Sequence, residues 1–561
     1  MEADPEKPAV SSASLPHEGK PRVSALPGRM ESGPHRIARS AIGLSVLSFL
    51  GPLSGFLVEI ALGWRYGVGA LVDGYRVGLV FFLFAQSIAW GILPNLVVPL
   101  FSQVTREKRA IEGWRVISAL GLIFFALGAA IATGGSIFAP LLARWFAPGL
   151  DAAGFAAATV FMRSFCLAVL PLAWSGILTG LFQCHRIFWV QPAAQGLYNL
   201  ILLGAILWSG PDRLALAPIL GCALVAVLFL SRLLSLAKQT GEPPFLLRRP
   251  SIRRLGVFFR NGLPLFLTLG IGYVGVIFLT RATSLLAAGS VASFGYAWKI
   301  LQLGLIVPGA LATVLFPRMS DAWSGKESVE FSRLWQEGLR WMIFLSAPLV
   351  FICAILSRDL VSVLFARGAF SGAAIEETSM VVAILAFSIP AAAGTAFLQK
   401  GFYSRGNTLL PSIISVLGAL LVMALSETTA RKFGLVGLAW LNPSIGWMSF
   451  LCLAFASRSA DSKSWRSWSN FLAGMLVAST IAGLAAYWAD RWISCESLVG
   501  SLLRLGIASA LSLLAYVLVL SALGVSEAAR VLAYAGWQLR ASTKTFAFSW
   551  QRGLRGLRLF W

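Results

Sequence analysis

Residues 289–320 read GSVASFGYAWKILQLGLIVPGALATVLFPRMS, a long apolar run that contains a single charge before its last residues. That charge is Lys299, the only charged residue between Arg281 and Arg318. A lysine inside a bilayer costs several kcal/mol, so it usually faces protein or water and has a function. We therefore expect Lys299 to line an internal cavity; a structural lysine that pairs with an acid or reaches the headgroups is the alternative.

The rest of the chain is equally apolar. Its 561 residues are 57% hydrophobic and only 12% charged, and the mean hydropathy is +0.77, outside the range of soluble domains. Apolar runs of about 20 residues, long enough to cross about 30 Å of hydrocarbon, recur about fourteen times. Because a backbone in lipid must satisfy its own hydrogen bonds, we predict an all-α polytopic membrane protein. The predicted spans begin near residues 41, 74, 116, 155, 188, 214, 262, 290, 341, 378, 409, 435, 468 and 499.

The net charge of +22 reflects membrane topology rather than nucleic-acid binding. Cations concentrate in the first 39 residues, in the loop at 106–115 and in the segment 231–260, whereas the alternate loops hold few. By the positive-inside rule these basic segments are cytoplasmic, and an even number of spans leaves both termini there. We therefore expect a multi-pass membrane protein with both termini in the cytoplasm.

The sequence also contains signs of an internal repeat. WFAPG at 145–149 matches LFARG at 364–368. Three residue pairs have nearly the same separation: Phe146 and Phe365 (219), Arg186 and Arg405 (219), and Pro99 and Pro317 (218). These matches predict two six-helix lobes in the same orientation, followed by two further helices. Parallel repeats are typical of transporters that hold their substrate between the lobes.

The predicted organisation is as follows. Residues 1–37 form a disordered cytoplasmic tail, 38–230 the first lobe, 231–260 a basic cytoplasmic linker, 261–458 the second lobe, 459–524 spans 13 and 14, and 525–561 a basic amphipathic tail. In the last segment, arginines and a lysine alternate with aromatic residues, a composition suited to the anionic inner leaflet.

Metal and thiol chemistry have little support in the sequence. The cysteines are scattered one by one: Cys166, Cys184, Cys222, Cys353, Cys452 and Cys495. No CxxC pair occurs and no P-loop motif is present, so we expect no metal, no cofactor and no ATPase activity.

Five stretches resemble the MviN/MurJ family of lipid II flippases, in the multidrug/oligosaccharidyl-lipid/polysaccharide exporter superfamily. They are GVGALVDGYRVG (67–78), FAPGL (146–150), the opening stretch 289–320, LFARGAF (364–370) and GFYSRGNTLLP (401–411), and they follow the family's order. The resemblance implies fourteen helices around a cationic central cavity. It also implies a protein of the bacterial cytoplasmic membrane. There an undecaprenyl-pyrophosphate-linked peptidoglycan precursor is flipped to the outer leaflet for cell-wall synthesis.

The same resemblance implies site residues. Lys299 falls where the family usually has an arginine that meets the pyrophosphate, and Gln302 follows one turn later where some members have glutamate. By contrast, Pro52, Val58 and Gln86 stand where arginines are expected, so much of the phosphate-binding charge is missing. Gln86 and Gln302 are candidates to bind sugars, although intramembrane glutamines also join helices.

Other charges match the family as well. Glu59 and Asp73 match acids of the first and second helices, with a structural or coupling role, and Arg163 matches a basic position of the fourth. Arg76, one turn after Asp73, is close enough to pair with it and lies near the outer end of its span, within reach of the headgroups. We expect Arg163 and Arg76 to be further contacts of the substrate.

The sequence is compatible with four functions. The first is a flippase for lipid II or for another polysaccharide precursor on the same carrier lipid. A multidrug or cation antiporter would need an acid inside the lobes, and an enzyme would need positioned carboxylates or histidines, which are few here. A diverged scaffold that no longer transports is the fourth. The sequence indicates no oligomeric state, and a monomer is compatible with it.

Overall fold

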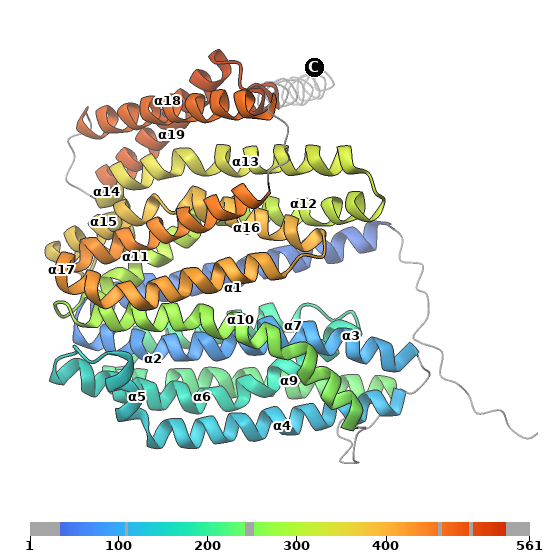
Figure 1. Ribbon diagram of the computed structural model, residues 1–561. Helices are drawn as coiled ribbons and strands as arrows, with labels where there is room; N and C mark the ends of the chain where they lie inside the picture. The colour runs from blue at the N-terminus through green and yellow to red at the C-terminus, as the bar shows by residue number, and fades with distance from the viewer. Residues whose placement is uncertain (1–33, 107–109, 242–251, 458–462, 493–497, 535–561) are drawn as a thin grey trace, which may run out of the picture. The chain divides into compact units, whose positions relative to one another are not determined.

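The computed structural model describes residues 34–106, 110–241, 252–457, 463–492 and 498–534 (Figure 1). The chain divides into two compact units, residues 1–46 and 47–561. The described part of the first unit is the helical segment 34–46, and all other described residues belong to the second unit. All elements in the described ranges are helical, which confirms the all-α prediction.

The N-terminal half consists of helices α1 to α9. Their bounds are α1 Pro34–Tyr66, α2 Ala70–Gln86, the π-helix η1 Ser87–Ile92, α3 Leu93–Arg106, α4 Ala110–Ile137, α5 Ala139–Phe146, α6 Ala152–Cys184, α7 Val190–Trp208, α8 Pro211–Leu214 and α9 Ala217–Thr240. The most buried of them is α6, which packs against α2, α3, α4 and α9. Glycines permit this close approach: a Cβ at Gly78 would lie 2.9 Å from the ring of Phe165.

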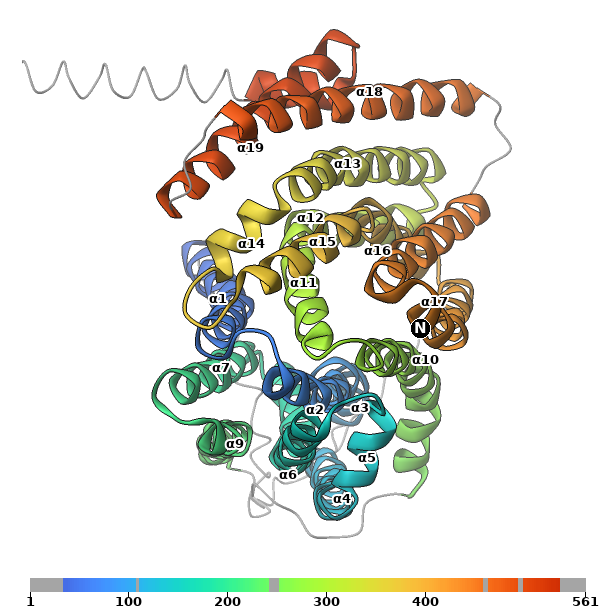
Figure 2. The same ribbon diagram turned by 90° about the vertical axis from the view of Figure 1, so that its left-hand side faces the viewer.

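The C-terminal half consists of helices α10 to α19. Their bounds are α10 Ile252–Ser284, α11 Ser290–Gly304, α12 Ile306–Ser324, α13 Ser328–Ile355, α14 Ser357–Phe365, α15 Gly372–Ala386, α16 Ile389–Ser404, α17 Leu409–Ala456, α18 Lys463–Trp492 and α19 Leu498–Ala522. Two pairs are bent spans, α11 with α12 by 47° and α15 with α16 by 45°. Figure 2 shows α18 beside α13. Helix α13 also contacts α19 and the residues that follow it: Arg340 pairs with Glu527 at 2.8 Å, and Tyr516 donates to the Phe344 carbonyl at 2.9 Å.

Nine described helices are long and apolar enough to cross a membrane, or eleven if each bent pair is one span. The 48-residue helix α17 is interrupted at Gly434, which has φ 60° and ψ −150°. Its two halves coincide with the predicted spans that begin near 409 and 435. The 33-residue helices α1 and α10 contain predicted spans 1 and 7 but are not among the nine. A polytopic protein is confirmed, and the number fourteen stays a prediction.

Two helix ends that the predicted repeat would match have the same kind of cap. At the end of α6, Arg186 N donates to Gln183 O and Ile187 N to Phe182 O, with Arg186 in the left-handed region at φ 59°. At the end of α16, Gly406 N donates to Tyr403 O and Asn407 N to Phe402 O, with Gly406 at φ 76°. Both are Schellman caps, and their capping residues, Arg186 and Gly406, lie 220 residues apart, one more than the predicted pair Arg186 and Arg405. Helices α12 and α19 end in the same kind of cap, so the internal repeat stays a prediction.

The predicted domain boundaries stay predictions. Helix α9 continues to Thr240 and α10 begins at Ile252, so helices cover both ends of the predicted linker 231–260. Its middle, 242–251, lies outside the described residues, as do 1–33 of the N-terminal tail and 535–561 of the C-terminal tail.

Candidate functional site

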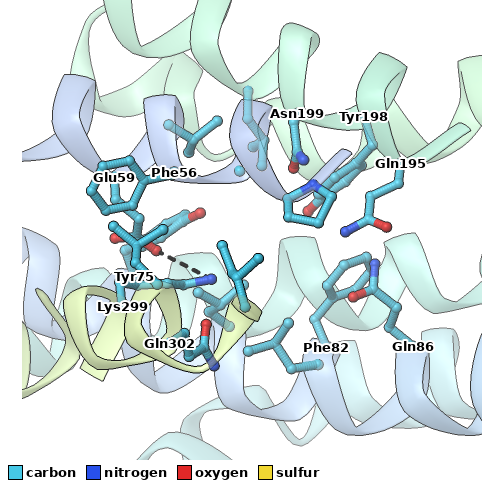
Figure 3. Close-up of a pocket in the computed structure, with 18 residues that line it drawn as sticks. Phe56, Glu59, Tyr75, Phe82, Gln86, Gln195, Tyr198, Asn199, Lys299 and Gln302 are labelled. Carbon is cyan, nitrogen blue, oxygen red and sulfur yellow. Dashed lines mark ion pairs between the residues drawn. The ribbon is translucent and has the colours of Figure 1, made fainter. Parts of the chain in front are cut away.

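A cavity of about 320 Å³ lies among α1, α2, α7, α11 and α12, so residues of both predicted lobes line it (Figure 3). Apolar side chains such as Phe56, Phe82 and Leu83 form much of its wall. Its charged and carboxamide lining consists of Glu59, Lys299, Gln86, Gln195, Asn199 and Gln302. The structure thus brings together Lys299, Gln86, Gln302 and Glu59, which the sequence singled out separately.

One end of the cavity is charged. The buried Glu59 accepts a hydrogen bond from Arg76 Nη2 at 2.6 Å, and it also forms a longer ion pair with Lys299, whose Nζ lies 3.9 Å from Glu59 Oε1 (Figure 3). Arg76 also stacks over the ring of Tyr296, 4.5 Å from its centroid. The side chain of Lys299 is 29% exposed and that of Arg76 only 7%. Because Arg76 already neutralises Glu59 closely, Lys299 is the cation that this cavity offers to an anionic ligand.

Pro52 and Val58, which stand where arginines were expected, also line this cavity. Lys299 therefore has no second lysine or arginine beside it in the described lining. Arg163 is exposed on α6 and is not one of the lining residues, so its predicted contact with substrate stays a prediction.

The predicted pair between Arg76 and Asp73 is wrong. Arg76 is buried against Glu59, so it does not reach the headgroups either. Asp73 instead accepts hydrogen bonds from two backbone N–H groups at the start of α11, Gly289 at 2.6 Å and Ala292 at 2.7 Å. Free N–H groups at a helix N-terminus attract a carboxylate, and this attraction outweighs the local i,i+3 spacing.

The Asp73 contact is part of a larger junction, formed by residues 64–76 and 145–149 on one side and 281–296 and 364–370 on the other. Tyr296 donates its hydroxyl to Gly67 O at 3.0 Å, and Ala369 N donates to Trp64 O at 2.9 Å. Arg281, which pairs with Glu427, also donates to Trp145 O at 2.6 Å. The repeated motifs WFAPG and LFARG thus both lie in the junction, which holds the two predicted lobes together at one end.

We expect Gly149→Ala to loosen the junction. A Cβ there would clash with the backbone of Ser284 and Leu285, whereas a Cβ at Gly134 of α4 meets nothing within 4 Å. Because backbone must move to make room, Gly149→Ala should cost about 1–3 kcal/mol. Thermal unfolding of the purified protein in detergent measures this loss against the control Gly134→Ala. Equal midpoints for the two variants would contradict the close packing.

Sequence reasoning missed three polar residues. Gln195 and Asn199 lie one turn apart on α7, and neither carries a charge that marks it as unusual. Lys400 is a second intramembrane lysine, in α16, and donates to Thr313 Oγ1 of α12 at 2.7 Å. Like Lys299, Lys400 is a charge within a long apolar run, so the sequence alone indicates it as well.

Comparison with known proteins agrees with the fold and the motifs. The family model described as lipid II flippase MurJ matches residues 65–508. The probable lipid II flippase MurJ of Rhizobium tropici is 26% identical over 467 residues, which cover 80% of this chain and 85% of that protein. The lipid II flippase MurJ of Burkholderia cenocepacia is 23% identical over 421 residues, 73% of this chain and 80% of that protein.

Solved structures share the fold. A lipid II flippase MurJ in an inward closed conformation superposes with a TM-score of 0.73 at 18% identity, covering 86% of this chain and 99% of the other. An inward-facing multidrug resistance transporter of the MATE family gives 0.60 at 16% identity, covering 73% and 94%. The second likeness shows that the exporter architecture extends beyond flippases. Because its family model matches well over half of the residues, this chain belongs to the lipid II flippase MurJ family.

Proposed function

We propose that this protein is a flippase that moves an undecaprenyl-pyrophosphate-linked saccharide, most directly lipid II, from the inner to the outer leaflet of the cytoplasmic membrane. The observation that carries the proposal is the cavity lined from both predicted lobes, with Lys299 as its available cation. A pyrophosphate brings about two negative charges into the membrane, and a cation within a polar cavity lowers the cost of that transfer. Membership of the MurJ family supplies the substrate class.

The junction supports a mechanism of alternating access. If the basic segments are cytoplasmic, the loops that form the junction lie on the outer side, and Asp73, Tyr296 and Arg281 hold that side closed. A headgroup then enters from the inner leaflet, and the junction must separate to release it outward. The segment 535–561 lies outside the described residues, and its contact with the anionic inner leaflet is proposed from its composition alone.

A proton-coupled or sodium-coupled antiporter would require an acid that is free to exchange its cation. Glu59 is bonded to Arg76 and Asp73 to two backbone N–H groups, so neither acid is available in this conformation. Transport of another precursor on the same carrier lipid fits the cavity as well as lipid II does, because the two substrates share the pyrophosphate.

Complementation tests the proposed substrate. Expression of the native chain in a bacterial strain depleted of its own lipid II flippase should restore growth and normal cell shape, since peptidoglycan precursors again reach the outer leaflet. The control is the empty vector, and the amount of protein in the membrane is measured in parallel. A protein that inserts at normal levels but leaves the cells to lyse would contradict lipid II as the substrate.

A further inference from the structure

The end of the cavity away from Glu59 holds two carboxamides that face each other. Figure 3 shows the amide groups of Gln86, the last residue of α2, and Gln195, in α7, pointing toward one another across the open space. Both side chains are partly exposed, and within the described part of the chain neither makes a hydrogen bond. A carboxamide is both a donor and an acceptor, so an unbonded pair that borders a cavity is suited to a polar, uncharged ligand.

Neighbouring helices contact the backbone and side chains around these two groups. The π-helix η1 begins directly after Gln86, and Trp90 within it donates to Ser175 Oγ of α6 at 2.9 Å. π-Helical turns are rare and frequently occur at functional sites, because they redirect the side chains around them. On the opposite side, Gln195 lies against α1, where a Cβ on Gly51 would be 3.4 Å from its Oε1.

Asn199, one turn after Gln195, differs from the two glutamines because its side-chain amide is hydrogen-bonded within the protein. Its Nδ2 donates to Gly51 O at 3.1 Å and to Ser54 Oγ at 3.0 Å, so its amide joins α7 to the part of α1 that contains Pro52. Asn199 is therefore a structural link between helices, whereas Gln86 and Gln195 are left for a ligand.

We infer that Gln86 and Gln195 form a carboxamide clamp that binds hydroxyl and amide groups of the saccharide, while Lys299 at the other end of the cavity meets the phosphate. The inference rests on the proposed function and assigns the sugar-recognition subsite within it. The volume of about 320 Å³ is at the lower end of ligand pockets, so the clamp holds one part of the headgroup rather than all of it. Since the clamp is neutral, it selects by hydrogen-bond pattern and not by charge.

The affinities of the purified full-length protein for two lipids distinguish the contributions of the two ends of the cavity. One lipid is lipid II, and the other is undecaprenyl pyrophosphate, which has the same carrier and phosphates but no sugar. The variant Gln86→Leu/Gln195→Leu should bind lipid II about tenfold more weakly, because hydrogen-bonding groups of the sugar lose their partners. Its affinity for undecaprenyl pyrophosphate should stay within about twofold of the native value, since that lipid has no group for the clamp.

Gln103→Leu is the matched control, because Gln103 is an exposed glutamine of α3 outside the cavity. Each single variant, Gln86→Leu or Gln195→Leu, should show part of the selective loss, so the test holds even if the double variant folds poorly. If the variants bind both lipids equally more weakly, or bind both as the native chain does, the clamp is contradicted and the proposed function is not. Failure of the native chain to bind lipid II would overturn the proposed function itself, and the clamp with it.

Discussion

Lys299→Glu is expected to abolish transport of the lipid-linked substrate, while Lys299→Arg should retain most of it. The substitution removes the available cation of the cavity and sets a second carboxylate near Glu59, which lies 3.9 Å from Lys299 Nζ. Losing one partner of a buried charge contact costs about 2–5 kcal/mol, so substrate affinity should fall by about thirtyfold or more. Binding of lipid II to the purified variants and growth of complemented cells measure the two consequences.

The control for this prediction is Lys432→Glu, which reverses an exposed lysine of α17 outside the cavity. It should bind lipid II as the native chain does.

The scaffold hypothesis predicts the opposite result for Lys299, because a protein that no longer transports should tolerate both Lys299→Ala and Lys299→Glu. Unchanged growth with both variants would favour the scaffold over the flippase.

Asp73→Ala is expected to release the junction. Its carboxylate accepts two backbone hydrogen bonds from the start of α11, and hydrogen bonds to a charged group contribute about 1.5–3 kcal/mol each. Losing them should shift the equilibrium away from the closed junction by about a hundredfold, if about 3 kcal/mol is lost in total. Transport should slow, because the protein returns to this conformation less readily in each cycle.

A disulfide across the junction reports this shift. Ala369 N donates to Trp64 O at 2.9 Å, so cysteines at these two positions, in a chain without its native cysteines, should cross-link rapidly. Asp73→Ala should slow the cross-linking strongly, whereas Asp321→Ala, at an exposed acid of α12, should not. The same rate with and without Asp73 would show that its hydrogen bonds do not hold the junction closed.

The sequence predicted the helical architecture well, because hydropathy is a local property. Even the break in α17 was predicted as a boundary between spans near 435, since the polar stretch around Glu427 and Lys432 interrupts the apolar run. Lys299 was predictable for the same reason: a charge in hydrocarbon requires a polar environment.

Pairing between helices was not predictable. Arg76 pairs with Glu59, 17 residues earlier in the chain, instead of Asp73, because helix packing rather than spacing decides which acid is near. Gln195 gave no signal, since an uncharged polar residue in an apolar helix can face a cavity, a neighbouring helix or an end of the span. For Arg163, the resemblance gives a position along the helix but not the face on which the side chain lies.

Movement of a lipid-linked saccharide across a membrane, through the cavity that contains Lys299, can be measured directly. The most direct measurement is the rate at which fluorescent lipid II moves between the two leaflets of vesicles that contain the purified protein. An impermeant quencher outside the vesicles reports the lipid in the outer leaflet. The rate is measured with a membrane potential imposed in either direction. We predict that the native chain moves lipid II at least about tenfold faster than protein-free vesicles do, and that Lys299→Glu returns the rate to that background. A native rate equal to background, or an undiminished rate with Lys299→Glu, would contradict the account.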